Sequence, residues 1–141
     1  VLAGGAKDEL KHETLLNELR VLRHIRHPNV VVFFGAIIDP QAQRLALVYE
    51  LIRGMQLGAA IKGLSPSPRN RHRIISDISN ALCYLHLQEP PIVHSDLKGG
   101  NVMVERTACC LRAKLIDFGL SRLLTRNSRE SGGTMGWSAP E

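Results

Sequence analysis

One short polar stretch constrains this chain more than any other part of it. Residues 94–101 read His-Ser-Asp-Leu-Lys-Gly-Gly-Asn, and Asp96 and Asn101 stand five positions apart. Neither a helix nor a strand places two side chains at that spacing on one face, so the pair can converge only on an irregular loop. A carboxylate there can accept a hydroxyl proton while an amide oxygen holds a metal ion. Asp117, which opens an Asp-Phe-Gly triplet, adds the charged oxygen that Mg²⁺ prefers as a ligand.

Length and composition describe an ordinary globular domain. The 141 residues are 44% hydrophobic and 22% charged, which is enough apolar material for the core of one domain. The sequence has no apolar run long enough to cross a bilayer and no secretory signal pattern, so we expect no membrane segment and a cytoplasmic location. Cys83, Cys109 and Cys110 are odd in number and lack the spacing of a zinc site, which predicts reduced thiols with no chemistry of their own.

A net charge of +5 raises the question of nucleic acid as a partner. The densest basic stretch is residues 69–73, Arg-Asn-Arg-His-Arg, and no aromatic residue is interleaved in it for base stacking. Such a stretch is more typical of the solvated start of a helix. We therefore expect no nucleic-acid partner.

The first third of the chain predicts a helix followed by a hairpin. Leucines recur at i, i+4 and i+7 within a helix over about residues 8–24. Glu18 shares a face with Leu22, so its carboxylate should point towards the protein. A β-branched and aromatic run at 30–34, bounded by a glycine, predicts a strand, and a second strand at 45–49 follows a turn.

The middle of the chain predicts two helices. Gly54 marks a break, and a short helix is expected over residues 55–63. A longer helix should begin at Pro68, with Ser67 as its N-cap, and end before Pro90. Its apolar residues fall on one face at helical spacing: Ile74, Ile78, Ala81, Leu82 and Leu85.

The last third predicts two short strands and a loop. The strands are expected at 102–104 and 113–116 around a turn. Residues 120–133 are polar, basic and serine-rich, which is typical of a mobile loop.

Taken together, residues 94–101, the Asp117 triplet and the Ala-Pro-Glu at 139–141 resemble the catalytic loop, the metal-binding motif and the end of the activation segment of protein kinases. The resemblance implies an α+β, bilobal protein-kinase-like fold that is present in part. Residues 1–52 would form a partial small lobe and residues 53–141 a partial large lobe. The implied activity is transfer of the ATP γ-phosphoryl group to hydroxyls of a protein substrate.

The resemblance also implies roles for particular residues. Asp96 would orient and deprotonate the attacking hydroxyl, and Lys98 would contact the ATP phosphates and neutralise charge on the transferred group. Asn101 and Asp117 would hold Mg²⁺ between the phosphates. Glu18 would pair with a lysine that grips those phosphates.

The adenine side of the site is implied in the same way. Tyr49 would be the gatekeeper behind the adenine pocket. The Glu50 carbonyl and the backbone N–H and carbonyl of Ile52 would bind adenine, and Met103 would form the pocket floor. Four further side chains match the stack that links the two lobes in an active kinase, and simple core packing would place them in the same way: Leu22, Phe33, His94 and Phe118.

The pattern indicates a class of substrate as well. Lys98 and the run from Gly133 and Thr134 to residue 141 resemble serine/threonine kinases of the tyrosine-kinase-like (Raf and mixed-lineage) group. In that setting Thr134 would hydrogen-bond near Asp96 and Lys98 and favour serine or threonine hydroxyls.

Two departures from the family pattern carry expectations of their own. Ser95 stands where the catalytic loop usually has an arginine, which predicts that phosphorylation of the activation loop at Thr125, Ser128 or Ser131 is not the usual switch. The sequence also shows no glycine-rich loop and no lysine to pair with Glu18, and it stops at Glu141. We therefore expect a domain truncated at both ends and poorly soluble in isolation.

Two alternatives belong to other classes of function. The first is a pseudokinase or inactive kinase fragment that acts as a binding module. The second is a small-molecule phosphotransferase of kinase-like fold. The sequence does not indicate an oligomeric state.

Overall fold

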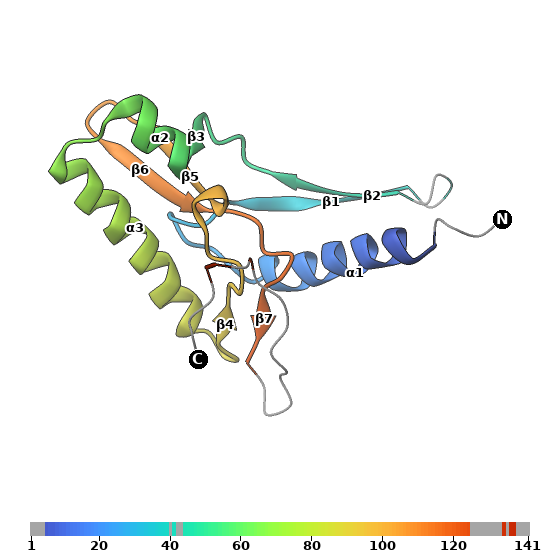
Figure 1. Cartoon of the computed structure of the whole chain (residues 1–141). Helices are drawn as coiled ribbons and strands as arrows, with labels where there is room; N and C mark the ends of the chain where they lie inside the picture. Colours follow the sequence, from blue (N-terminus) through green and yellow to red (C-terminus); the bar gives the residue numbers. More distant parts are fainter. Residues whose placement is uncertain (1–4, 40, 42–43, 125–133, 135, 138–141) are drawn as a thin grey trace.

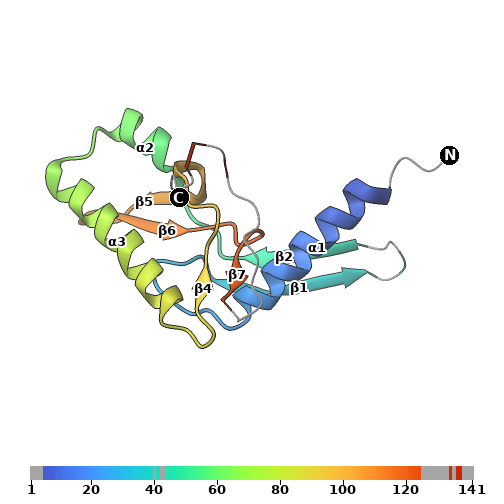
Figure 2. The same cartoon turned by 60° about the horizontal axis from the view of Figure 1, so that its bottom comes forward.

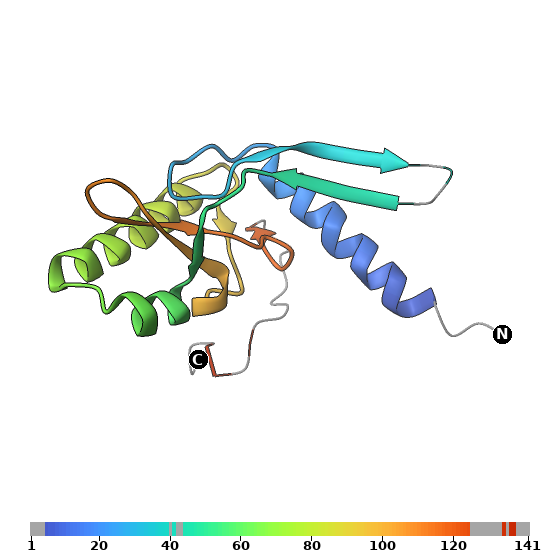
Figure 3. The same ribbon diagram turned by 90° about the horizontal axis from the view of Figure 1, so that it is seen from above.

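The computed structural model describes residues 5–39, 41, 44–124, 134 and 136–137. Helix α1 (Gly5–Leu22) and the hairpin of β1 (Phe33–Asp39) and β2 (Arg44–Tyr49) form one part of the molecule. Figure 1 shows both extending to the same side, and in Figure 3 the hairpin runs alongside the helix. The expected helix near residues 8–24 and the expected hairpin are therefore both present.

The other part of the molecule combines two helices with a three-stranded sheet. Strand β3 (Gly54–Gln56) pairs antiparallel with β5 (Val102–Arg106), which pairs antiparallel with β6 (Leu111–Leu115). Helix α2 (Leu57–Leu64) follows β3, and α3 (Pro68–His86) packs along β6. The mixture of helix and sheet agrees with the expected α+β class.

The segment that carries the polar stretch lies between these two parts. Strand β4 (Ile92–Val93) precedes it, and a short 3₁₀ helix, η1 (Gly99–Asn101), ends it. Strand β7 (Arg122–Leu123) returns to pair with β4, and Figure 2 shows this small sheet between α3 and α1. The loop expected over 120–133 thus contains a short strand near its start, and residues 125–133 lie outside the described residues.

Two predicted elements begin later than expected. The strand expected at 30–34 begins at Phe33 and continues to Asp39, because Gly35, which was taken as its end, pairs with Val48. The bulge just before this glycine leaves Phe34 as the extra, unpaired residue. The helix expected at 55–63 begins at Leu57, since the two residues before it pair with β5. Gly54 permits that pairing, because a Cβ there would overlap the Val104 carbonyl.

Helix α3 matches its prediction closely. The Ser67 hydroxyl accepts a hydrogen bond from the Asn70 N–H at 3.4 Å and caps the helix, and Pro68 occupies the first helical position. The predicted apolar face is buried at Ile74, Ala81 and Leu85 and half-buried at the other two positions.

Backbone and aromatic contacts join the segment after α1 to the large sheet and to α3. The Asn29 carbonyl accepts from the Leu115 N–H, the Val31 N–H donates to the Leu115 carbonyl, and the Asn29 side chain donates to the Ala113 carbonyl, each at 2.9 Å. The His27 and Tyr84 rings stack with centroids 4.9 Å apart. These contacts fix α1 relative to the polar stretch.

The core lies at this junction. Leu22, Phe33, His94 and Phe118 are all buried, with exposed fractions of 6% or less. The rings of His94 and Phe118 are 4.9 Å apart. Among the helices in the described residues, none is both long and apolar enough to cross a membrane.

Candidate active site

The polar stretch forms an irregular loop, as the spacing of Asp96 and Asn101 predicts. The Asn101 side-chain NH₂ donates to the main-chain carbonyl of Asp96 and to its Oδ2, both at 2.9 Å. The Asn101 N–H donates to the Lys98 carbonyl at 2.9 Å and closes the turn into η1. The asparagine therefore holds the loop around Asp96, and its amide oxygen remains directed away from these bonds.

Asp96, Lys98 and Thr134 form a triangle of charge-assisted hydrogen bonds. The Lys98 Nζ lies 2.7 Å from the Asp96 Oδ2 and donates to the Thr134 Oγ1 at 2.8 Å. The Thr134 hydroxyl in turn donates to the Asp96 Oδ1 at 2.5 Å. Thr134 comes from a distant part of the chain. Its hydrogen bonds with Asp96 and Lys98 are those that the resemblance to kinases implies.

This triangle sets the charge of Asp96. Burial on its own raises the pKa of the Asp96 carboxyl, but the hydrogen bonds from Lys98, Thr134 and Asn101 outweigh it and hold the pKa below its usual range. The carboxylate is therefore ionised at neutral pH. The loop thus presents a fixed, negatively charged hydrogen-bond acceptor.

The buried side chain of His94 stabilises the loop through its hydrogen bonds. Its buried ring places Nε2 3.2 Å from the Ile116 carbonyl, and its Nδ1 accepts from the Asp96 N–H at 3.4 Å. Burial lowers the pKa of His94, so the ring is neutral and carries its proton on Nε2. The His94 carbonyl accepts from the Ser121 hydroxyl at 3.0 Å, which ties the loop to the segment after Asp117.

Asp117 lies at the start of that segment in a backbone conformation that few residues adopt. Its φ is +65°, its side chain is exposed, and its Oδ1 accepts from the Gly119 N–H at 3.3 Å. Gly119 packs tightly against α1, because a Cβ there would lie 2.6 Å from the Thr14 Cγ2. The carboxylate of Asp117 is thus presented on a turn anchored to the helix.

Helix α1 contacts this turn through two neighbouring residues. The Glu18 Oε1 accepts from the Phe118 N–H at 3.3 Å. The Asn17 NH₂ donates to the Gly119 carbonyl at 3.1 Å and to the Ser121 carbonyl at 2.6 Å. Sequence reasoning missed Asn17, and the available signal was its position one turn before Val21, which is buried on α1.

The donor set at this turn suits a hard cation bound partly by phosphates. Within the described residues no three His, Cys, Asp or Glu side chains gather into a metal cluster. Asn101 and Asp117 instead offer one amide oxygen and one exposed carboxylate. Mg²⁺ is commonly held by one or two such protein oxygens together with phosphates and water, so these residues fit it.

Comparisons with known proteins decide the family. The model of the protein kinase domain matches residues 2–141. The chain belongs to the protein kinase family. It is 35% identical over 133 residues to the serine/threonine-protein kinase CTR1 of Arabidopsis thaliana, covering 89% of this chain and 16% of that protein.

Two further relatives are also named as serine/threonine-protein kinases. The chain is 34% identical over 145 residues to the probable serine/threonine-protein kinase SIS8 of Arabidopsis thaliana, covering 99% of this chain and 13% of that protein. It is 32% identical to the probable serine/threonine-protein kinase DDB_G0271682 of Dictyostelium discoideum, covering 93% and 13%. The chain spans at most about a sixth of the length of these curated relatives. The resemblance to the kinase family is confirmed.

Glu50 and Tyr49, to which the resemblance assigns places around adenine, differ in how the chain holds their side chains. The Glu50 carboxylate lies 2.5 and 2.6 Å from the Lys114 Nζ and accepts from the Val32 N–H at 2.8 Å. Burial, followed by the Glu18 carboxylate, raises the pKa of the Tyr49 hydroxyl. Among the described residues this hydroxyl has no hydrogen-bond partner of ordinary geometry. Sequence reasoning missed Lys114, because its partner Glu50 lies 64 positions away and no neighbouring residue indicates the contact.

The remaining expected contacts lie near this point. The Ile52 carbonyl accepts from the Gly54 N–H at 3.0 Å, so one of its two expected adenine contacts already has a partner in the chain. Met103 is half-buried in β5, opposite Gln56 of β3 and Lys114 of β6. The loop position usually occupied by arginine holds Ser95, which has φ +64° and donates to the Val93 carbonyl at 3.4 Å.

A cavity opens on the other side of Lys98. It has a volume of about 360 Å³ and is lined by Gln56, Leu57, Gly58, Ile61, Lys98, Gly99, Gly100 and Trp137. It therefore adjoins the side chain that contacts Asp96.

Proposed function

We propose that this chain carries catalytic residues of a serine/threonine protein kinase, which transfers the ATP γ-phosphoryl group to serine or threonine hydroxyls of proteins. The observation that carries the proposal is the hydrogen-bonded triangle of Asp96, Lys98 and Thr134. It holds an ionised carboxylate and an ammonium group 2.7 Å apart in one loop. Phosphoryl transfer needs such positioning and charge neutralisation more than it needs covalent chemistry from the protein.

Asp96 is proposed to accept a hydrogen bond from the incoming hydroxyl and to take its proton as the bond to phosphorus forms. Its lowered pKa keeps it in the accepting form at neutral pH. Lys98 is proposed to offset negative charge on the transferred group. Thr134 is the positioning residue that fixes both of them.

Asn101 and Asp117 are proposed to hold Mg²⁺. When bound, the ion would neutralise phosphate charge. The Asn101 NH₂ is committed to Asp96, which orients its amide oxygen as a ligand. Asn17 and Glu18 of α1 fix the turn on which Asp117 stands, so the helix also positions the carboxylate.

For adenine, the proposed contacts are the Glu50 carbonyl, the Ile52 N–H and the Met103 side chain. The Glu50 carboxylate forms an ion pair with Lys114, and this contact restrains the main chain at Glu50. Other expectations remain predictions: the division into lobes at residues 52 and 53, the cytoplasmic location, and the pairing of Glu18 with a lysine.

The test is a phosphotransfer assay with serine- and threonine-containing peptides on the intact protein that carries this chain. Asp96→Asn keeps the shape of the side chain but removes its charge, and should lower the transfer rate by at least about a hundredfold, the range for loss of a general base. ATP affinity should stay unchanged. Glu89→Gln, at an exposed loop position, is the matched control and should retain full activity.

Two results would separate the proposal from its rivals. A wild-type protein that binds ATP but transfers nothing would favour the pseudokinase or binding-module alternative. Phosphorylation of small alcohols in preference to peptides would favour the small-molecule phosphotransferase.

A further inference from the structure

The turn between β5 and β6 holds two thiols side by side. The Sγ atoms of Cys109 and Cys110 are 3.6 Å apart, and both cysteines are free. The Thr107 hydroxyl lies 3.8 Å from the Cys109 Sγ and 3.4 Å from the Cys110 Sγ. It also donates to the Cys110 carbonyl at 2.9 Å, so a single threonine fixes the pair.

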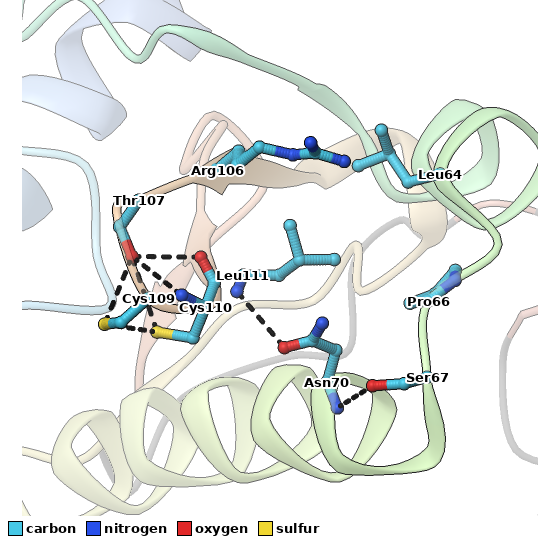
Figure 4. A pocket seen from close by; sticks show the side chains of 9 residues that line it. All are labelled: Leu64, Pro66, Ser67, Asn70, Arg106, Thr107, Cys109, Cys110 and Leu111. Carbon is cyan, nitrogen blue, oxygen red and sulfur yellow. Dashed lines mark hydrogen bonds between the residues drawn. The ribbon is translucent and has the colours of Figure 1, made fainter.

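A cavity of about 230 Å³ adjoins this turn. Figure 4 shows the two sulfurs together at one end of it, while the Arg106 side chain extends towards Leu64 at the other. Apolar side chains of Leu64, Pro66 and Leu111 line the space between. It is smaller than the usual pocket for a drug-sized ligand, and suits one arm of a small molecule.

The charges around the turn favour an anionic partner. Hydrogen bonds with Thr107 and Cys109, followed by the guanidinium groups of Arg73 and Arg112, lower the pKa of the Cys110 thiol. A thiolate stabilised by neighbouring cations is the reactive form of cysteine. The same cations repel metal ions, and within the described residues no third His, Cys, Asp or Glu completes a metal cluster here.

We propose that Cys109 and Cys110 form a thiol–disulfide exchange site for a small disulfide that carries carboxylate groups. The Cys110 thiolate attacks one sulfur of the disulfide, forms a mixed disulfide and releases the other half as a thiolate, which takes up a proton. Cys109 then loses its proton to solvent and attacks the Cys110 sulfur. This step forms the Cys109–Cys110 disulfide and releases the second half as a thiol. Two protein thiols are oxidised, and one small disulfide is reduced to two thiols.

Arg106 is proposed to bind a carboxylate of the incoming disulfide. The role follows from its place across the cavity from the sulfurs, where it can orient one arm without contacting the reacting atoms. It predicts a preference for anionic over neutral disulfides of similar size. The site lies at the opposite end of β5 and β6 from the Asp96 loop, and it is independent of the proposed kinase activity.

The experiment treats the intact protein with oxidised glutathione at neutral pH and follows each cysteine by mass spectrometry of its peptides. In the wild type, a transient adduct at Cys110 should give way to a Cys109–Cys110 disulfide. Cys109→Ser should trap the adduct on Cys110, and Cys110→Ser should abolish reaction at the turn. Cys83 is an internal control, because it is exposed on α3 and has no thiol next to it.

Arg106→Gln adds a test of the cavity. It should slow the reaction with oxidised glutathione but leave the rate with neutral hydroxyethyl disulfide unchanged. All these side chains lie at exposed or half-exposed positions, so the variants should keep the wild-type thermal transition. Equal rates at Cys83 and Cys110, or no adduct on Cys110 in Cys109→Ser, would overturn the proposal.

Discussion

Replacing Thr134 tests the hydrogen-bonded triangle at the centre of the proposed active site. Thr134→Val keeps the shape of the side chain and removes the hydroxyl that donates to Asp96 and accepts from Lys98. The Asp96 carboxylate then loses one of the three side-chain hydrogen bonds that hold it. The Lys98 and Asn101 contacts with Asp96 remain.

The size of the effect follows from those remaining contacts. A hydrogen bond to a charged group contributes about 1.5–3 kcal/mol, and the lower end applies because two other partners still fix the carboxylate. A loss of about 1.4 kcal/mol in the transition state lowers kcat/KM about tenfold. We therefore expect about a tenfold loss in Thr134→Val and near wild-type activity in Thr134→Ser, which restores the hydroxyl.

The same substitution should move the pH profile. The Thr134 hydrogen bond is one of the contacts that lower the pKa of Asp96, so its loss lets that pKa rise towards the ordinary value. Because activity requires the ionised carboxylate, the acidic limb of the kcat/KM profile should shift to higher pH. A Thr134→Val enzyme with wild-type kcat/KM and an unmoved acidic limb would refute the reasoning, as would a Thr134→Ser enzyme that fails equally.

Two further predictions concern stability. Asp77 is buried on α3, and its Oδ2 accepts from the Ala113 N–H at 2.9 Å and from the Arg112 Nε at 3.0 Å. Asp77→Ala leaves that buried N–H without an acceptor and should lower the free energy of unfolding by about 2 kcal/mol in urea denaturation, and an unchanged midpoint would contradict this. Burial lowers the pKa of His94, so the unfolded chain binds a proton that the folded chain does not. The free energy of unfolding should therefore fall as the pH drops below about 6.5, the ordinary pKa of histidine. The fall should be less steep in His94→Phe. Equal slopes of unfolding free energy against pH in the two proteins would argue against a neutral His94.

The catalytic loop was predictable because its information is local. The spacing of Asp96 and Asn101 excludes regular structure, and their contact in the structure follows from the loop that this spacing requires. The N-cap at Ser67 and the buried face of α3 were predictable for the same reason, since a cap and a helical period are properties of neighbouring residues. Thr134 was anticipated only through the resemblance to kinases.

What sequence reasoning missed are long-range polar contacts. Asn17 binds carbonyls 102 and 104 positions away, and Asp77 binds an amide 36 positions away. Nothing in the neighbourhood of either residue indicates a partner, because the partner is a backbone group that every residue possesses. Strand β1 was misplaced for a related reason, since Gly35 belongs to the strand only through its pairing with Val48 of β2.

The most direct test of the account is ATP binding by the intact protein with and without Mg²⁺, by titration calorimetry, in the wild type and in Asp117→Ala. The account predicts that Mg²⁺ strengthens ATP binding in the wild type and that this gain disappears in Asp117→Ala. Glu89→Ala, an exposed carboxylate outside the site, should keep the gain. If Mg²⁺ has no effect on the wild type, or if Asp117→Ala keeps the full gain, then Asn101 and Asp117 do not form the metal site and the central claim fails.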